Sequence, residues 1–283
     1  MVSPILRAVP SLPMTESFFT DDSMIRRVHR EWAIALSGPR ALLMQAAHPL
    51  AVSGLLAHSS AMDEPYDRLQ RTAETMSAIT FGPREEAEQI TTMIRGMHAK
   101  VRGRLREPVG IFPVGTPYRA DQPDLLLWVL FTLVDSGVVV YRKYVGAMSR
   151  AEEGAYWDDY KVVGELFGLK RSDMPDTLDD LHDYRREMLE GDVLLVTSWA
   201  RKRAREIVME PPVPWIAQPL LQTANFITIG LLPDRIRNQY GFAPLPPAPV
   251  RKALVAGGAE YVKRAVVPFL PERLRFVPSA RAA

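Results

Sequence analysis

The feature that most restricts the fold of this chain is a long apolar run over residues 125–141. Polar residues and a glycine interrupt the run at positions 135–137, whereas a membrane-spanning helix needs about 20 largely uninterrupted apolar residues. The run therefore predicts a helix over residues 123–145 that is buried in the core of a globular protein, because a helix that is apolar on most sides needs protein around it.

Helical periodicity, capping residues and proline or glycine boundaries recur along the rest of the chain. We find no run of alternating apolar and polar residues that predicts a strand. We therefore expect an all-α, single-domain helical bundle of about ten helices over residues 17–276, after an irregular segment 1–16 and before a flexible tail 277–283. The other predicted helices cover 22–36, 39–58 with a kink at Pro49, 65–80, 83–103, 149–167, 177–190, 193–209, 214–229, 233–240, 250–267 and 271–275.

Composition excludes several classes of function. The 283 residues include no cysteine, which excludes disulfides, thiolate metal sites, iron–sulfur clusters and covalently attached haem. The net charge of +2 predicts no nucleic-acid partner, and the basic run 201–205 reads as the solvent-facing side of a helix. The first residues lack a signal-peptide pattern, so we expect a cytoplasmic protein. A weak contact with a membrane surface and the oligomeric state are left open.

One histidine stands out on the predicted helix 83–103. Apolar residues recur there at three- and four-residue spacing, and His98 lies on or beside the stripe that they form, which consists of Ile90, Ile94, Met97 and Val101. We expect the His98 imidazole to face the core, where it needs a partner. A hydrogen-bonded core histidine is the simplest interpretation, and a metal ligand is the alternative.

Other polar residues fall on helices that should be central. His48 lies at the predicted Pro49 kink, and Arg68, Arg71 and Thr72 share nearly one face of the next helix. Burying such groups is costly unless a ligand or ion pairs with them, although the arginines could instead pair with acidic neighbours at the surface. We find no glycine-rich phosphate loop, no GxSxG motif and no HExxH pair, and Asp179-x-x-His182 is only a poor match to a di-iron site.

Several segments, in order and spacing, resemble the MpaB/rubber-oxygenase family, and together they extend from about residue 25 to 245. The resemblance implies an all-α fold that holds haem b, uses O2, and cleaves a double bond in a small apolar, isoprenoid-like substrate. The segments are RALLMQAAHPLAVSG (40–54), HS (58–59), RLQRT (68–72), FG (81–82), MHAKVRG (97–103), YRADQPDLLLWV (118–129), ExxxYWDDY (152–160) and LPDRIR (232–237).

The resemblance also implies roles for single residues. His98 matches the proximal iron ligand of the family, and Arg68 and Thr72 match its distal arginine and threonine. Arg71 stands where rubber oxygenase has a lysine that can bind the iron, and an arginine cannot deprotonate to do so. We find no match for the catalytic glutamate of the rubber enzyme. Where many relatives have WVHAT, this chain has WVLFT over residues 128–132, so a polar group is lost.

The remaining assignments complete a haem site around His98. Arg95 and Arg102 could pair with the haem propionates, Trp128 and the apolar helices would wall the macrocycle, and His48 would line the distal side. Two alternatives stay open. One is a non-catalytic helical protein that binds a hydrophobic ligand, with Leu130 and Phe131 enlarging its pocket, and the other is a metal-free enzyme using His48 and Arg68.

Overall fold

The computed structural model describes residues 16–58, 65–209, 226–242 and 271–282, with five single positions between 257 and 267. Residues 1–15 of the predicted irregular segment 1–16 and most of the predicted helices 214–229 and 250–267 lie outside these residues. The side chains of residues 55–58, 65–69, 205–209, 273–274 and 281–282 are also outside the description, and these include His58 and Arg68.

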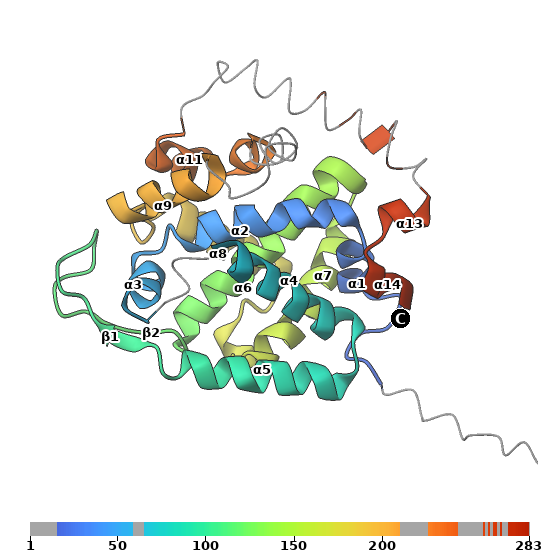
Figure 1. Cartoon of the computed structure of the whole chain (residues 1–283), viewed down its shortest axis with the longest axis horizontal. Helices are drawn as coiled ribbons and strands as arrows, with labels where there is room; N and C mark the ends of the chain where they lie inside the picture. Colours follow the sequence, from blue (N-terminus) through green and yellow to red (C-terminus); the bar gives the residue numbers. More distant parts are fainter. Residues whose placement is uncertain are drawn as a thin grey trace, which may run out of the picture.

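The described chain is mostly α-helical, which confirms the predicted fold class. Figure 1 shows the helices wrapped around a central one, α6. Twelve α-helices are described: α1 (Met24–His29), α2 (Ser37–Gln45), α3 (Pro49–His58), α4 (Pro65–Phe81), α5 (Arg84–His98), α6 (Pro123–Val140), α7 (Arg150–Leu166), α8 (Leu178–Glu190), α9 (Ser198–Met209), α11 (Asp234–Tyr240), α13 (Glu272–Arg275) and α14 (Pro278–Ala282).

Helix α6 forms the core, as its apolar run predicts. It packs most extensively against α2 and also contacts α7, and a π-helical turn, Tyr141–Val145, extends it to the predicted end. By length and composition alone this helix could cross a membrane, but 72% of its most apolar window is buried inside the protein. Burial of this degree is what the core helix of a globular protein shows.

The predicted helix 39–58 is not one kinked helix but two separate ones. Helix α2 ends at Gln45 and α3 begins at Pro49, so the proline starts a new helix rather than bending an old one. The Gln45 carbonyl accepts the amide of His48 at 3.1 Å, and the Ala47 carbonyl accepts the amide of Leu195 at 2.8 Å. The connection between α2 and α3 is thereby stabilised by one hydrogen bond within itself and one to the segment before α9.

The expectation that the chain contains no strand is wrong. Helix α5 ends at His98 instead of 103, and strand β1 (Arg102–Arg104) pairs antiparallel with β2 (Pro117–Arg119). Gly103 lies opposite Tyr118 in this pair, and a Cβ on Gly103 would be 2.4 Å from the Tyr118 hydroxyl oxygen. The glycine that seemed to end a helix is therefore needed for close contact across a hairpin.

Three further boundaries differ from the predictions. The first helix, 22–36, is divided into α1 and a 3-10 helix, Trp32–Leu36. Helix α9 starts at Ser198 rather than 193, because the preceding residues run beside the α2–α3 break. Most of the predicted tail is the helix α14, and the amide of Val277 just before it donates to the Arg30 carbonyl at 2.8 Å.

Candidate functional site

Helices α4 and α5 form an antiparallel pair that is closed by Gly82 and Pro83 and open at the other end (Figure 1). The closed half is packed, with Met76, Ile79 and Thr80 buried on α4. Residues 70–74 of α4 are all exposed. Because five successive residues point in all directions around a helix, no side of this part of α4 is covered. The open half of the α4–α5 pair therefore presents surface that the closed half buries.

His98 lies at this open end, as the last residue of α5, and is half-buried. Its Nδ1 is shielded from solvent, so the exposure of the residue comes from its other atoms. The amide of Val101 donates to the His98 carbonyl at 3.0 Å, and a Cβ on Gly54 of α3 would be 3.4 Å from Val101 Cγ1. His98 thus lies three residues before Val101, which is beside the apolar helix α3.

His48 is buried at the start of α3. Its ring packs against Phe112 at a centroid distance of 5.9 Å, and its Nδ1 has no hydrogen-bond partner in another described residue. Burial lowers the pKa of His48 to about 4, because the charged ring cannot be solvated there. The imidazole is therefore neutral near pH 7.

Trp128 is fully buried and stacks on Phe131 at 5.6 Å, and its Nε1 also lacks a hydrogen-bond partner among the described residues. Phe131 meets the edge of Tyr184 at 5.5 Å, and Leu130 is 4% exposed. Leu130 and Phe131 therefore fill the core, which gives no support to the idea that they enlarge a ligand pocket.

The predicted polar residues Arg71, Thr72 and Arg102 lie at the surface and do not gather in the interior. Arg71 and Thr72 are exposed on α4, so they are not aimed at the interior as their shared helix face suggested. Arg102 is exposed on strand β1 and does not lie one helical turn beyond His98. The Arg68 side chain lies outside the described residues. The roles of these four residues stay predictions.

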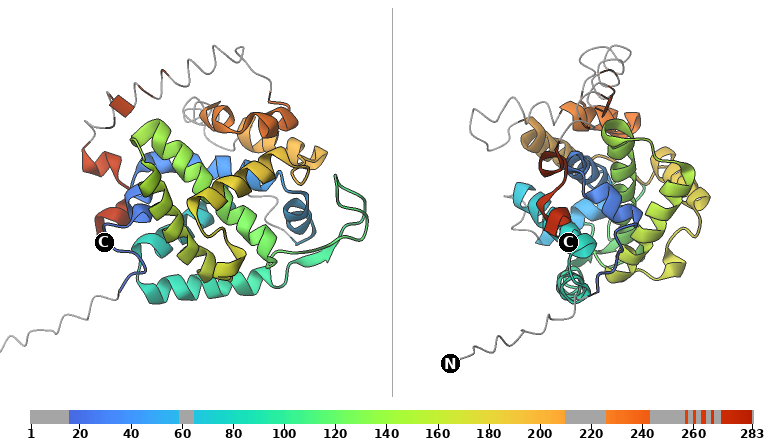
Figure 2. Two further views of the ribbon diagram at one scale, coloured as in Figure 1. Left: turned by 180° about the vertical axis from the view of Figure 1, so that it is seen from behind. Right: turned by 90° about the vertical axis from the view of Figure 1, so that its right-hand side faces the viewer.

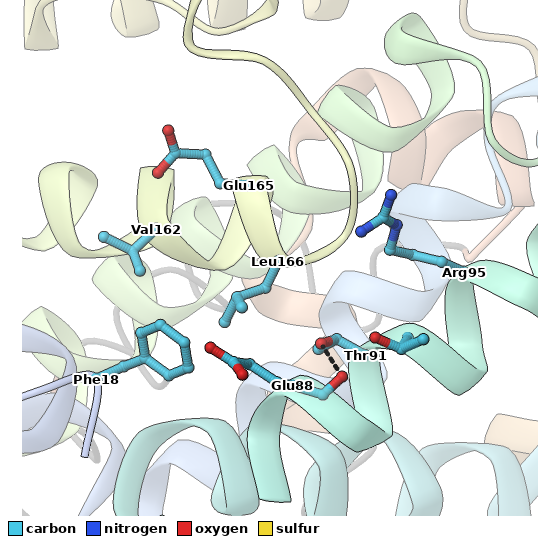
Figure 3. Close-up of a pocket in the computed structure, with 8 residues that line it drawn as sticks. Phe18, Glu88, Thr91, Arg95, Val162, Glu165 and Leu166 are labelled. Carbon is cyan, nitrogen blue, oxygen red and sulfur yellow. Dashed lines mark hydrogen bonds between the residues drawn. The ribbon is translucent and has the colours of Figure 1, made fainter. Parts of the chain in front are cut away.

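Arg95 lies beside a hollow of about 250 Å3 between α5 and α7 (Figure 3). Its Nε is 3.3 Å from where a Cβ on Gly168, just after α7, would be. The hollow is smaller than the ~300 Å3 at which ligand pockets usually begin, and two carboxylates line it, so it does not suit an anionic macrocycle. The lining residues are Phe18, Glu88, Thr91, Thr92, Arg95, Val162, Glu165 and Leu166.

Comparison with known proteins decides the family. The model of a family described as "ER-bound oxygenase mpaB/B'/Rubber oxygenase, catalytic domain" matches residues 26–264. The chain belongs to this MpaB/rubber-oxygenase family. Uncharacterised proteins of Mycobacterium tuberculosis and Mycobacterium bovis are each 23% identical to it over 201 residues, which cover 69% of this chain and 75% of theirs. No solved structure matches.

Membership of the MpaB/rubber-oxygenase family supports oxygenase activity and confirms the resemblance seen in the sequence. Within the described residues, no three His, Cys, Asp or Glu side chains gather as they would around a metal held by protein alone. His182, the histidine of the poor di-iron match, instead lies 3.0 Å from Glu153. A haem iron needs only one protein ligand, so the absence of such a group among the described residues does not bear on the haem site that the sequence predicts.

Sequence reasoning missed two buried polar clusters near the core. Arg40 pairs with Asp135 and Ser136 of α6, each at 2.7 Å, and the polar interruption of the apolar run was the signal that could have revealed it. His29 lies 2.9 Å from the Tyr160 hydroxyl, and no local pattern predicts that contact. Both clusters hold helices together around α6.

Proposed function

We propose that this protein is a haem b-dependent oxygenase that uses O2 to oxidise a small apolar substrate, isoprenoid-like or lipid-like, with His98 as the proximal iron ligand. The position of His98 supports the proposal most directly. It ends α5 at the open end of the α4–α5 pair, three residues before Val101, which lies beside Gly54 of α3. Its Nδ1 is shielded from solvent, so the ring lies partly inside the protein, as a ligand to a buried cofactor would.

The residues near His98 fit haem b in their chemistry. Haem is a flat apolar ring with two anionic propionates, and α3 offers an apolar wall while Arg102 offers an exposed cation. Haem b, when bound, supplies redox chemistry that side chains lack. Arg95 is a weaker propionate partner than its spacing suggests, because it lies on the side of α5 that faces α7.

The chain's own residues would bind and orient the substrate. We assign the distal side to His48, Arg68, Arg71 and Thr72, of which His48 is neutral and carries a buried Nδ1 that can donate or accept one hydrogen bond. The Arg71 guanidinium has only donors, so it can donate hydrogen bonds but cannot bind iron. The apolar helices α3 and α6 would exclude water from the substrate.

The partners follow from the same proposal. We expect a small apolar substrate and O2, and no nucleic acid, which the net charge of +2 supports. We also propose a cytoplasmic location.

We assign the fully packed Trp128 to the wall of the site, which it would stabilise from behind without touching the cofactor.

An absorption spectrum tests the proposal. Protein expressed with added haem precursor should show a Soret band and consume O2 with an unsaturated apolar substrate. His98→Ala should lose the band, whereas His182→Ala, which alters another half-exposed histidine, should keep it. The proposal would be refuted if the wild-type protein stays colourless after haem addition and His98→Ala behaves in the same way. Bound lipid without porphyrin in native mass spectrometry would favour a non-catalytic binding protein, and turnover by haem-free protein would favour a metal-free enzyme.

A further inference from the structure

The hairpin over residues 102–119, which contains β1 and β2, projects from one end of the helical body (Figures 1 and 2). We call this hairpin the arm. Its inner side is anchored, since Val109 and Phe112 pack with the buried Leu50, Leu105 and Leu125. Backbone hydrogen bonds of 2.9 and 3.0 Å join Val109 and Phe112 across a tight turn. The arm is therefore held in a defined position, and its outer side is what it offers to a partner.

The outer side of the arm is apolar at its tip. Ile111 and Val114 are 54% and 63% exposed, and Leu195, from the segment before α9, is 36% exposed. The two segments adjoin, because a Cβ on Gly110 would be 3.3 Å from Leu195 Cδ2. We call these three residues, Ile111, Val114 and Leu195, the apolar tip. Scattered exposed apolar residues need no explanation, but a group drawn from two segments does.

Positive charge surrounds the apolar tip. Arg104 and Arg106 are exposed on the arm, and Arg201 and Lys202 are exposed on α9, which starts three residues after Leu195. The arm and α9 occupy the same end of the molecule in Figures 1 and 2. Nearby negative charges are Glu107 on the arm and Asp192, which lies 3.7 Å from Arg235. Exposed cations therefore outnumber anions around the tip.

We propose that this end of the molecule docks on the surface of an anionic lipid bilayer. The apolar tip would enter the boundary between headgroups and acyl chains, and the cations would lie against lipid phosphates. Stable protein interfaces bury about 800 Å2 on each partner, of which three side chains supply only a fraction. A bilayer needs no matching shape, so a small apolar tip with a basic surround suits it better than it suits a protein.

The arm also connects the docking surface to the interior. Phe112, which follows the tip residue Ile111, is the residue that packs on the buried His48 ring. A docked arm would bring the covering of His48 next to the bilayer, the phase in which an apolar substrate is dissolved. This consequence rests on the proposed function, but the docking itself does not.

Vesicle binding tests the docking directly, because it needs neither haem nor turnover. The full chain should sediment with phosphatidylcholine vesicles that contain about 30% phosphatidylserine, and not with pure phosphatidylcholine. About 0.5 M salt should release it, since the cations act through a screened field. Ile111→Asp/Val114→Asp should lower the bound fraction about fivefold or more, while Met93→Asp, at a residue 61% exposed on α5, should not. Circular dichroism melting should be unchanged in both variants.

A second measurement locates the contact. The chain contains no cysteine, so Ile111→Cys and Met93→Cys can each carry a single environment-sensitive fluorophore. With the phosphatidylserine vesicles, the label at residue 111 should shift its emission to the blue and the label at 93 should not. The proposal would be overturned if the wild-type protein does not bind these vesicles, or if the tip substitutions leave binding unchanged. Equal emission shifts at both labels would also overturn it, and so would a protein partner that protects the tip from solvent where vesicles do not.

Discussion

Arg40 and Asp135 form a buried ion pair between α2 and α6, with 2.7 Å between Arg40 Nη2 and Asp135 Oδ2. Only 1% of the Arg40 side chain and 9% of the Asp135 side chain are exposed. Burial raises the pKa of the Asp135 carboxyl, but the charges of Arg40 and Arg185 outweigh it and hold that pKa below its usual value. Asp135 is therefore ionised in the folded state, and the pair fixes how α2 lies on the core helix.

Removing one member of this pair should be costly. Asp135→Asn leaves the Arg40 charge buried without a counter-charge, so we expect a loss of about 3 kcal/mol in the free energy of unfolding. Asp183→Asn, which removes an exposed ion pair with Arg186, should change it by less than about 0.5 kcal/mol. Urea unfolding measures both. Equal effects of the two substitutions would show that the buried pair does not hold α2 to α6.

Gly137 of α6 provides space for Tyr156 of α7, because a Cβ there would be 2.4 Å from the Tyr156 hydroxyl oxygen. We expect Gly137→Ala to destabilise the protein by about 1–3 kcal/mol through this overlap, despite the better helix propensity of alanine. Tyr156→Phe removes the overlapping oxygen, so Gly137→Ala should cost clearly less in that background. Thermal melting of the four proteins in this cycle checks it, and strictly additive losses would contradict the packing argument.

The buried His48 should make stability depend on pH. Its pKa is about 4 in the folded protein and ~6.5 when unfolded, so the unfolded chain binds more protons between these values. Stability therefore falls as the pH drops from ~6.5 to 4, by up to about 3 kcal/mol for this group. His29, whose pKa burial also lowers to about 4, acts in the same direction. His48→Phe should thus weaken the pH dependence measured by urea unfolding, and an unchanged slope would show that His48 is solvated.

The C-terminal residues should contribute to stability through Glu31. This carboxylate is 2% exposed and receives Arg275 Nη2 at 2.7 Å and Nε at 2.9 Å. Arg275→Ala leaves it buried with only Arg30 Nε, 4.0 Å away, as a nearby cation, so we expect a loss of about 2–4 kcal/mol. Arg264→Ala breaks only an exposed pair with Glu260 and should change little. Adding Glu31→Gln to Arg275→Ala should recover part of the loss. If Arg275→Ala leaves the free energy of unfolding unchanged, the C-terminal segment does not pair with Glu31.

Local sequence signals predicted the elements whose stability is local. The Ser149–Glu152 capping box starts α7 in the structure as in the prediction, and the apolar run becomes the buried α6. The end of α5 could not be predicted in this way, because Lys100 and Gly103 suit a helix C-terminus as well as they suit a hairpin. What decides between them is pairing with residues 117–119, which lie farther along the chain.

The surroundings of His98 depend on the same kind of distant contact. The apolar stripe predicted Met97 to be buried, yet it is 51% exposed. The buried residues of α5 are Ala87 and Thr91, which with Ile94 and His98 recur at three- and four-residue spacing. Neither alanine nor threonine is strongly apolar, so the apolar periodicity predicted burial of the neighbouring helix face, which carries Met97. The neighbours of an amphipathic helix, and not its sequence alone, decide which side is covered.

Haem binding by a His98→Gly variant tests the central claim most directly. Glycine would leave space for a free imidazole at the position of the missing side chain. We predict that this variant purifies without a Soret band and regains a histidine-type haem spectrum when haem and imidazole are added together, as wild type does with haem alone. A variant that binds haem like wild type without imidazole would contradict the assignment of His98 as the iron ligand.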